Sequence, residues 1–235
     1  MPSIFLKALV KSPFFGGINL RLAERSVYKN FTFYTTSEHD ELEEIYRIRY
    51  KVYCEEYRYL DYRDYPNKRE QDIFDRHSIH LVVRHNSGDL AATARLILGS
   101  DDGLPILRNF EIDYRLQPVD VNQVAEISRL IVARNYRRKH LLLVLIKGIY
   151  LLVKERHLNN IFCVLDDKLT PNLEEFNIPI TRIGKSKIFQ GITAPYVIHV
   201  NEFEEKMYEK NRSLLKFLSN GSLSPHGKDY RYSLH

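Results

Sequence analysis

The sequence predicts a single α/β domain in which helices flank a central sheet. The β-branched, apolar run Val124–Val132 is typical of a central strand, and the apolar segment 141–153 after it is typical of a buried helix. Strand patterns at 78–85 and 90–98 flank the turn 86–89, Asn-Ser-Gly-Asp, and predict an antiparallel hairpin. A hydrophobic content of 44% and a charged content of 28% are ordinary for a globular protein of 235 residues.

The domain organisation follows from where these patterns begin and end. Residues 1–30 are predicted to form an N-terminal helical extension, 31–220 the domain, and 221–235 a flexible tail. The extension is expected to pack on its own domain, and peripheral membrane contact through an amphipathic helix is the alternative. The remaining strands are expected at 31–35, 161–165, 180–183 and 196–200, and the remaining helices at 37–53, with Ser37 as the cap, 171–176 and 202–218.

Charge and cysteine content limit the class of protein. The 35 basic and 30 acidic residues give a net charge of +5, a mild excess that does not indicate nucleic acid, and no such partner is expected. Cys54 and Cys163 provide neither a disulfide framework nor a set of metal ligands, which favours a reducing cytoplasm. Lys147 and the charged residues 154–156 keep the apolar helix shorter than the roughly 18 to 20 residues that a bilayer requires.

The predicted central strand carries charged side chains, and these need a reason because a buried charge is costly unless it is paired or used in a reaction. Glu126 and Arg129 therefore belong either to an internal salt bridge or to a reaction site. They are three residues apart and would point to opposite faces of a regular strand, so a shared cleft requires a β-bulge near Ser128 to Val132. A buried carboxyl with a raised pKa suits a general base, and Glu126 is the best candidate.

Basic residues follow this strand and open the apolar helix. They are Arg134, Arg137, Arg138 and Lys139. Because backbone amides at a helix N-terminus attract phosphate, this turn suits an anionic ligand. Solvated surface charge is the alternative explanation.

Two arginines outside the strand are placed unusually. Arg49 falls on the apolar stripe of the predicted helix 37–53, where it either snorkels to the rim or belongs to a site. Arg95 shares a strand face with small residues, which leaves room for a ligand beside it.

The segment 70–80 contains three carboxylates and two histidines. An acidic turn before a strand is favoured over a metal site, because no compact ligand set accompanies these residues. Asp72 and Asp75 are expected to stay ionised and to pair with Arg95 or Arg129.

Five short motifs are arranged in an order that resembles a known group of acyltransferases. They are Arg49-x-x-x-Tyr53, Glu70-x-Asp72-x-Phe74-Asp75, His80-Leu81, Arg95-Leu96 and Glu126-Ile127-Ser128-Arg129. From about residue 46 to 200 they resemble the acyl-homoserine-lactone autoinducer synthases, and more closely the N-acyl amino acid synthases and the exosortase-associated acyltransferases of bacteria. The resemblance implies the GNAT acyltransferase fold, with a mixed, mostly antiparallel central sheet of about six to seven strands flanked by helices.

The resemblance also implies substrates and roles. A fatty acyl chain comes from the phosphopantetheine thioester of an acyl carrier protein, the acceptor is a small amine or an amino acid, and no tightly bound cofactor or metal is implied. Glu126 matches the glutamate that draws the proton from the amine through water, and the predicted catalytic residues are Glu126, Ser128 and Arg129. The predicted substrate-binding residues are Arg49, Tyr53, Tyr59, Asp72, Asp75 and Arg95, and the predicted carrier-binding residues are Arg134, Arg137, Arg138 and Lys139.

Two departures from these family patterns bear on the substrates. Tyr59 stands where the autoinducer synthases have tryptophan, which argues against a homoserine lactone product, although such a synthase stays an alternative. His140 and Leu142 stand where the GNAT phosphate loop has small residues. Coenzyme A needs a tight, glycine-lined turn, so these two residues argue against an ordinary coenzyme A acetyltransferase. A non-catalytic GNAT-like module that binds an acylated carrier protein or a lipid is a further alternative.

Overall fold

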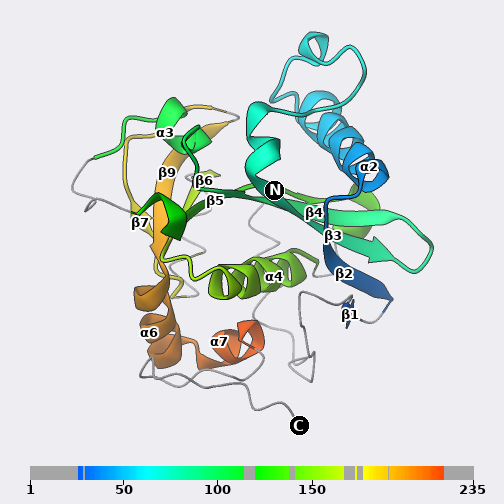
Figure 1. Cartoon of the computed structure of the whole chain (residues 1–235). Coiled ribbons are helices and arrows are strands. Elements are labelled where there is room, and N and C mark those ends of the chain that lie inside the picture. The colour runs from blue at the N-terminus through cyan, green and yellow to red at the C-terminus, as the bar shows by residue number, and fades with distance from the viewer. Residues whose placement is uncertain are drawn as a thin grey trace.

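The computed structural model describes residues 26–28, 30–113, 120–137, 141–166, 173, 177–189 and 191–219 (Figure 1). The predicted tail, residues 1–25 of the predicted extension, nearly all of the predicted helix 171–176, and Arg138, Lys139 and His140 lie outside the described residues. The last residues of the extension, Ser26–Tyr28, were expected to be helical, and this is wrong. They form strand β1, because their backbone pairs antiparallel with the next strand.

A central sheet of nine strands organises the described chain. All neighbouring strands are antiparallel except β5 and β6, and β8 pairs with β9 beside the main strand order β1-β2-β3-β4-β5-β6-β9-β7. The prediction of six to seven strands was too low because it did not include the short β1 and β8, whereas the strand predicted at 180–183 is present as β7. The strands are β1 (Ser26–Tyr28), β2 (Phe31–Thr36), β3 (Ser78–His85), β4 (Leu90–Leu98), β5 (Val124–Val132), β6 (Asn160–Asp166), β7 (Thr181–Arg182), β8 (Lys187–Ile188) and β9 (Ile192–His199).

Helices and short helical turns fill most connections between these strands, and α6 and α7 follow the last strand. The longer ones are α2 (His39–Tyr50), which continues as the π-helix η1 (Lys51–Glu56), α3 (Pro105–Asn109), α4 (Leu141–Glu155), α6 (Val200–Lys210) and α7 (Arg212–Leu218). The 3-10 turns are η2 (Tyr62–Asp64), η3 (Ile73–His77), η4 (Val121–Gln123) and η5 (Arg134–Tyr136). None of the helices in the described part of the chain combines the length and the apolar character of a bilayer-crossing segment.

Two details of the helices differ from the prediction. Ser37 does not cap α2, because Glu38 occupies the N-cap position and makes no side-chain cap bond. The predicted terminal helix 202–218 is two helices, because Asn211 leaves the helical conformation and its side chain accepts the N–H of Leu214 at the start of α7. A side-chain cap of this kind starts a new helix.

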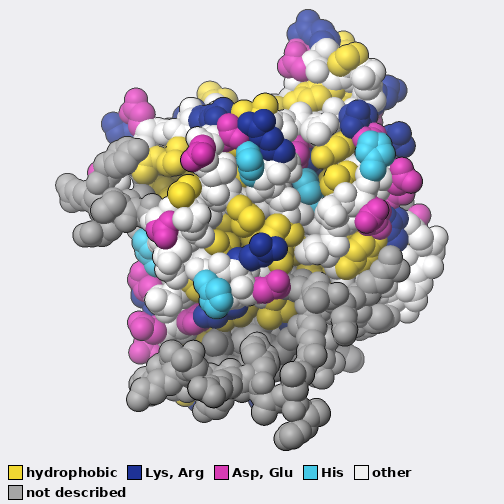
Figure 2. All heavy atoms as spheres, in the orientation of Figure 1, with side chains coloured by type: hydrophobic (Ala, Val, Ile, Leu, Met, Phe, Trp, Pro, Cys, Tyr) yellow, Lys and Arg dark blue, Asp and Glu magenta, His cyan; other side chains and the backbone are white. Residues whose placement is uncertain are grey.

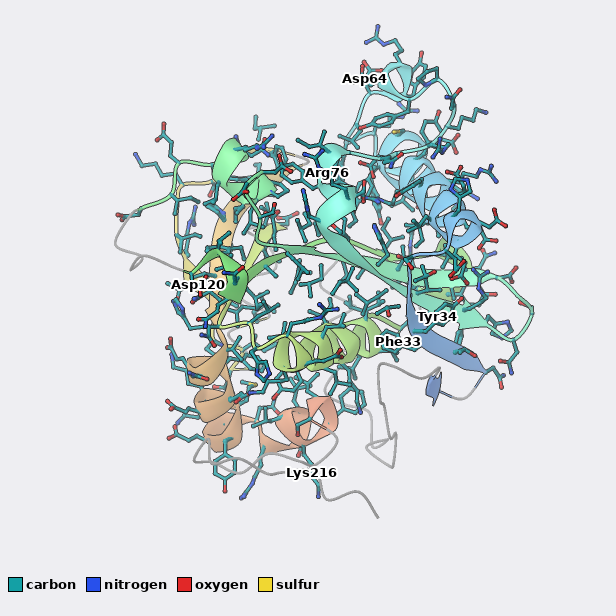
Figure 3. All side chains as sticks on the ribbon, viewed as in Figure 1. Phe33, Tyr34, Asp64, Arg76, Asp120 and Lys216 are labelled. Atoms are coloured by element: carbon teal, nitrogen blue, oxygen red, sulfur yellow. The ribbon has the colours of Figure 1, made fainter. Side chains whose placement is uncertain are left out.

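Helices cover both faces of the sheet (Figure 1). Phe33 and Tyr34 on β2 point to opposite faces (Figure 3): Phe33 joins the core under α4, and Tyr34 joins the cluster under α2. The approach of α4 to the sheet is close, because a Cβ atom on Gly148 would lie 1.8 Å from the ring of Phe33. The face opposite α4 carries α2, η3 and α3, and this face holds the candidate site.

Candidate active site

Strand β5 contains a bulge in the middle of its charged segment. Thr93 pairs with Ile131 and Arg95 pairs with Ser128, so one residue of β4 faces two residues of β5 between these pairs. Arg129, one of the two, has a φ of 49°, a conformation that non-glycine residues rarely adopt. The predicted bulge is therefore confirmed, and it accounts for the presence of Arg129 in the same cluster of charges as Arg95.

The bulge coincides with the end of the pairing between β5 and β6. The parallel ladder runs from the pair Val124 and Asn160 to the pair Ile127 and Cys163 and then stops. Both strands continue, β5 to Val132 and β6 paired with β9 up to Asp166. The backbone N–H and C=O groups of β5 beyond Ile127 that point toward β6 therefore make no ladder hydrogen bonds with it. Unpaired groups of this kind can hydrogen-bond to an extended ligand.

Glu126 is buried on the first half of β5, where its side chain is 3% exposed. Its cross-strand neighbours are Ile97 and Phe162, which belong to an apolar cluster on this face. The backbone N–H of Ile106 in α3 donates to Oε2 of Glu126 at 2.8 Å. Burial raises the pKa of Glu126 to about 7, although this hydrogen bond and the charges of Arg95 and Arg129 act in the lowering direction.

Three arginines and three carboxylates form a closed ring of ion pairs beside Glu126. Each arginine comes from a different element, α2, β4 or β5, whereas all three carboxylates come from the segment 70–75. Going around the ring, Arg49 lies 2.8 Å from Glu70, Glu70 2.6 Å from Arg129, Arg129 3.3 Å from Asp72, Asp72 2.7 Å from Arg95, Arg95 2.9 Å from Asp75, and Asp75 2.8 Å from Arg49. The formal charges cancel, which allows burial.

The ring keeps its carboxylates ionised. Burial alone would raise the pKa of Asp75, but Arg49 and Arg95 outweigh it and lower the pKa to about 2. The pKa values of Asp72 and Glu70 are also lowered, because their arginine partners overcome the effect of burial. The predicted pairing of Asp72 with Arg95 and Arg129, and of Asp75 with Arg95, is present.

The structure decides between the two interpretations of Arg49. This side chain is fully buried and pairs with Glu70 and Asp75, so it does not snorkel to the rim. All three carboxylates of the ring are held by ion pairs with Arg49 or Arg95, and a structural role in joining α2, β4 and β5 follows from that geometry. In contrast, no Lys or Arg side chain in the described residues forms an ion pair with Glu126, the carboxyl with the raised pKa.

Two groups of the site were missed as site residues. Glu70 was part of a family motif but received no role, although it is fully buried and bridges Arg49 and Arg129. A carboxylate in a segment with three acidic residues gives no sign of which one is buried. The N–H of Ile106 was also missed, although Pro105 at the first helical position could have marked the start of α3 in the long connection 101–122.

Two of the remaining predicted residues, Ser128 and Tyr53, contact arginines of the ring. The Oγ atom of Ser128 accepts a hydrogen bond of 2.9 Å from Nε of Arg95. The guanidinium of Arg129 lies 5.2 Å from the ring centre of Tyr53. Tyr59 is exposed and lies 6.4 Å from Tyr53, ring centre to ring centre, and it stacks on Tyr57 at 5.3 Å. π-helical turns such as η1 often occur at functional sites.

The predicted carrier-binding residues are only partly described. Arg134 is exposed. Arg137 is partly buried, pairs with Glu56, lies 5.6 Å from the ring centre of Tyr57, and donates to the carbonyl of Val132 at 3.2 Å. A phosphate at this turn would therefore compete with Glu56 for Arg137. Arg138 and Lys139 lie outside the described residues.

His80 is buried beside the ring, with Nε2 3.7 Å from a carboxylate oxygen of Asp75. Burial and the charge of Arg49 lower the pKa of His80 to about 4, so the imidazole is neutral at pH 7. Among the described residues, no three His, Cys, Asp or Glu side chains are grouped so that they would hold a metal ion. The carboxylates of the segment 70–80 bind arginines instead.

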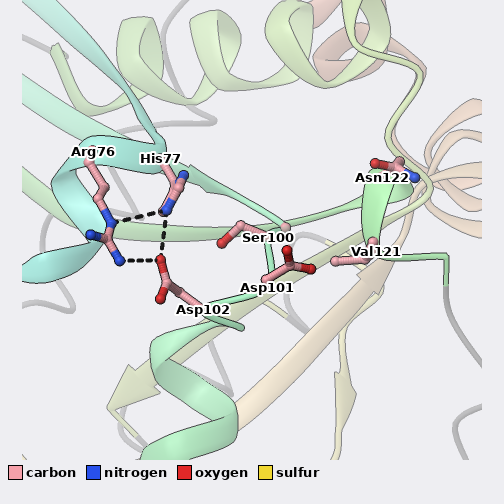
Figure 4. A pocket seen from close by; sticks show the side chains of 8 residues that line it. Arg76, His77, Ser100, Asp101, Asp102, Val121 and Asn122 are labelled. Atoms are coloured by element: carbon pink, nitrogen blue, oxygen red, sulfur yellow. Dashed lines mark hydrogen bonds and ion pairs between the residues drawn. The ribbon is translucent and has the colours of Figure 1, made fainter.

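A surface hollow of about 550 Å³ lies beside this site but does not include Glu126. Arg76 and His77 at the end of η3 and Asp102 are mutually hydrogen-bonded there (Figure 4). Figure 2 shows charged and histidine side chains gathered near η3 on this face. Because the titratable trio Arg76, His77 and Asp102 is mutually satisfied and the hollow does not include Glu126, the chemistry is better assigned to the buried carboxyl of Glu126 than to this hollow.

The comparisons with known proteins support a GNAT acyltransferase domain in this chain. Residues 48–147 match the family model described as an acetyltransferase (GNAT) domain. This range contains Glu126 and all six residues of the ion-pair ring. A search of the curated proteins found no match.

Solved structures of acyl-transferring synthases are similar in fold. A CoA-dependent acyl-homoserine lactone synthase, BjaI, with SAM and isopentyl-CoA, has a TM-score of 0.61 at 17% identity over 79% of this chain and 84% of that chain. The AHL synthase LasI has a TM-score of 0.60 at 14% identity over 77% and 95% of the two chains. FeeM, an N-acyl amino acid synthase from uncultured soil microbes, has a TM-score of 0.52 at 12% identity over 75% and 94%.

Proposed function

We propose that this enzyme moves a fatty acyl chain from a thioester to the amino group of an amino acid or a similar small amine. The observation that carries the proposal is Glu126, a buried carboxyl whose pKa is raised to about 7 and which forms no ion pair with the neighbouring ring. A base with a pKa near the working pH combines a large ionised fraction with a useful affinity for the proton. The fold resembles that of synthases that make N-acyl products.

The reaction forms an amide bond and breaks a thioester bond. The amine nitrogen attacks the thioester carbonyl, ionised Glu126 takes a proton from that nitrogen through a water molecule, and the sulfur leaves as a thiolate that is protonated to a thiol. Backbone N–H groups of β5 beyond Ile127 are candidates to stabilise the developing oxyanion, because the ladder with β6 ends there. The amide groups of a phosphopantetheine arm would pair with the same backbone edges.

The ion-pair ring positions the base and does not react. It ties β5 to β4 and α2 through Arg129, Arg95 and Arg49, next to the strand segment that carries Glu126. A buried, neutral ring keeps the bulge in one geometry, and that geometry sets the distance between the base and the end of the β5–β6 ladder.

For the donor we propose an acyl carrier protein. A carrier protein presents one phosphodiester, for which Arg137 and the amides near the start of α4 would suffice, and its acidic surface would meet Arg134, Arg138 and Lys139. Leu142 occupies a position where the coenzyme A loop has a small residue. Some similar synthases are described as CoA-dependent, so coenzyme A is the competing donor.

The experiment that tests this function supplies donors and acceptors separately. The full chain is incubated with acyl carrier proteins of mixed acyl length, or with the matching acyl coenzymes A, and with the proteinogenic amino acids or S-adenosylmethionine, and the products are read by mass spectrometry. N-acyl amino acids formed from the carrier protein support the proposal. An acyl-homoserine lactone would assign the chain to the autoinducer synthases, and the absence of any acyl transfer would support a binding module.

The donor assignment has its own control. Reversal of charge at Arg138 and Lys139 is expected to raise KM for the carrier protein, and less so at high salt, where screening already weakens docking. Equal use of free acyl coenzyme A without an effect of the reversal would contradict the carrier-protein assignment.

A further inference from the structure

Asp102 links η3 to the turn that leads into α3. A terminal nitrogen of Arg76, at the end of η3, donates to Oδ2 of Asp102 at 2.6 Å, and Nε2 of His77 lies 2.7 Å from the same oxygen (Figure 4). These two contacts lower the pKa of Asp102, so its carboxylate is ionised at neutral pH. The proposed reaction leaves this trio without a role.

A second contact joins the same two helical turns. The guanidinium of Arg108, on α3, donates to the backbone carbonyl of Asp102 at 2.6 Å and lies 4.9 Å from the ring centre of Phe74 on η3. The position of η3 is itself fixed, because Asp75 in η3 belongs to the ion-pair ring. The turn before α3 is therefore tied to a rigid part of the site.

This turn carries the hydrogen-bond donor of Glu126. Three residues separate Asp102 from Ile106, whose N–H donates to Glu126 at 2.8 Å. Leu104 and Ile106 are buried, and their packing holds α3 on the domain. Apolar packing is non-directional, whereas a hydrogen bond weakens steeply when its length or angle changes. Polar contacts at Asp102 are therefore suited to setting the direction of the Ile106 N–H.

We infer that Asp102 is a positioning residue for Glu126. Asp102 binds the side chains at the end of η3 and thereby holds the turn before α3 in the place from which the N–H of Ile106 reaches the carboxyl. The ion-pair ring is connected in this way, through η3 and α3, to the carboxyl that stands outside it. Because Glu126 is the base only under the proposed function, the importance of this link for catalysis rests on that proposal.

Loss of the link is expected to raise the pKa of Glu126 further. The bond from Ile106 acts in the lowering direction, because a hydrogen bond to a carboxylate stabilises its ionised form. A change of charge alone predicts the opposite, since removal of the negative charge of Asp102 would make ionisation of Glu126 easier. The direction of the shift therefore separates positioning from electrostatics. Other groups that interact electrostatically with Glu126 are unchanged by a substitution at position 102, and they include Arg95, Arg129, Asp72 and Cys163.

The first test measures the titration of Glu126 and needs no turnover. The full chain with isotope-labelled glutamate carboxyl groups is titrated by NMR, and the resonance that is missing in Glu126→Gln identifies this residue. Asp102→Ala is expected to raise the pKa of Glu126 by about 0.5 or more. Asp102→Asn, whose amide oxygen can still accept both contacts, is expected to stay closer to the wild type. Asp101→Ala, which removes the adjacent exposed carboxylate, is the matched control and is expected to cause no rise.

The fold is expected to survive these substitutions. The side chains of Asp102 and Arg76 are 28% and 62% exposed, and exposed ion pairs contribute little to stability. Thermal unfolding measures this. Arg76→Ala breaks the link from its other side, and adding it to Asp102→Ala is expected to shift the pKa of Glu126 little further, because both substitutions remove the same contact.

The second test is the pH profile of kcat/KM with the substrates of the wild type. If the pKa of Glu126 rises from about 7 by 0.5 to 1, its ionised fraction falls about three- to ninefold at pH 6 and hardly changes at pH 9. Asp102→Ala is therefore expected to lose activity by this factor on the acid side alone. A residue that only stabilises the fold would lower the rate at every pH.

An unchanged or lowered pKa of Glu126 in Asp102→Ala would overturn the inference, because the buried Leu104 and Ile106 would then hold α3 without the link. An equal rise in Asp101→Ala, or a loss of activity by the same factor at every pH, would overturn it as well. Failure of the proposed function gives a different result: Glu126→Gln keeps the wild-type rate, while the NMR titration of Glu126 still responds to Asp102→Ala.

Discussion

The backbone N–H of Ile106 donates a hydrogen bond of 2.8 Å to the carboxyl of Glu126, and both residues are buried. The bond fixes one carboxyl oxygen and leaves the other to act on a proton. Because burial outweighs the effect of this bond and of Arg95 and Arg129, the pKa of Glu126 is raised to about 7. Ile106 therefore orients the group without fixing it in the ionised state.

Glu126→Gln tests the role of this carboxyl. The amide has nearly the same shape and can still accept the N–H of Ile106, so the fold is expected to persist. A lost general base is expected to lower kcat/KM by about 10² to 10⁴. Steady-state kinetics with the donor and acceptor found for the wild type measure the effect, and Glu205→Gln, at an exposed position of α6, is the control. A variant with the wild-type rate would show that the base lies elsewhere.

The pH dependence of kcat/KM tests the raised pKa. Glu126 acts as a base only when it is ionised, so the rate is expected to rise with pH and to bend near pH 7 instead of near the usual carboxyl value of 4.5. Deprotonation of the acceptor amine adds its own rise, so the informative quantity is the ratio of wild type to Glu126→Gln. A ratio that is already constant from pH 5 upwards would show that the carboxyl titrates normally.

Removal of Arg129 tests the ion-pair ring. Arg129→Ala is expected to lower the free energy of unfolding by about 3 kcal/mol, because breaking a buried ion pair leaves a buried carboxylate without enough positive charge near it. The carboxylate affected most is Glu70, which pairs with Arg129 at 2.6 Å and is fully buried, and Asp72 is affected less. Urea unfolding measures the change. Arg63→Ala removes an exposed ion pair with Asp61 and should have no measurable effect.

Acid stability tests the pKa of Asp75, which is lowered from 3.8 to about 2. A carboxyl with a lowered pKa in the folded state stabilises the fold above its ordinary pKa, and this contribution disappears as the pH falls through the lowered value. The free energy of unfolding is therefore expected to fall by about 2 kcal/mol from this group between roughly pH 4 and pH 2. Asp75→Asn should show less of this decline. An equal decline in both proteins would place the acid-sensitive groups elsewhere.

Glu56→Gln tests whether Arg137 binds the phosphate of the donor. Glu56 forms an ion pair with Arg137. Removing the charge of Glu56 is therefore expected to free the guanidinium of Arg137 and to lower KM for the donor severalfold. Arg137→Ala should have the opposite effect and raise KM for the donor. If both substitutions leave KM for the donor unchanged, Arg137 holds the segment after η1 in place and does not contact the donor.

The short-period alternation of apolar and polar residues in the sequence was enough to predict the strands and the helix that position the site. The bounds of β3, β4 and β5 agree with the sequence prediction, because alternation and β-branched residues distinguish a strand from its immediate surroundings. The bulge in β5 also followed from the sequence, since Glu126 and Arg129 are three residues apart and both needed to face one site. The helix after β5 was expected because its apolar residues exceed what a surface helix would carry.

Tertiary structure alone decided how the charges combine. Arg49 meets Asp75 across 26 residues of sequence and Arg129 meets Glu70 across 59, and no local pattern states which of the carboxylates in the segment 70–75 reaches which arginine. The same holds for the N–H of Ile106, which α3 brings to Glu126, and for Glu56, which reaches Arg137.

The sequence by itself determined the fold class, the central strand and the identity of the carboxyl proposed as the base, because these depend on local periodicity and on the cost of placing charge in an apolar strand. Tertiary structure decided that Glu126 stands outside the ring of ion pairs while Glu70, Asp72 and Asp75 stand inside it. That difference sets their pKa values in opposite directions, since a carboxylate that gains two arginines is held ionised and a buried one without an ion-pair partner holds its proton up to about pH 7.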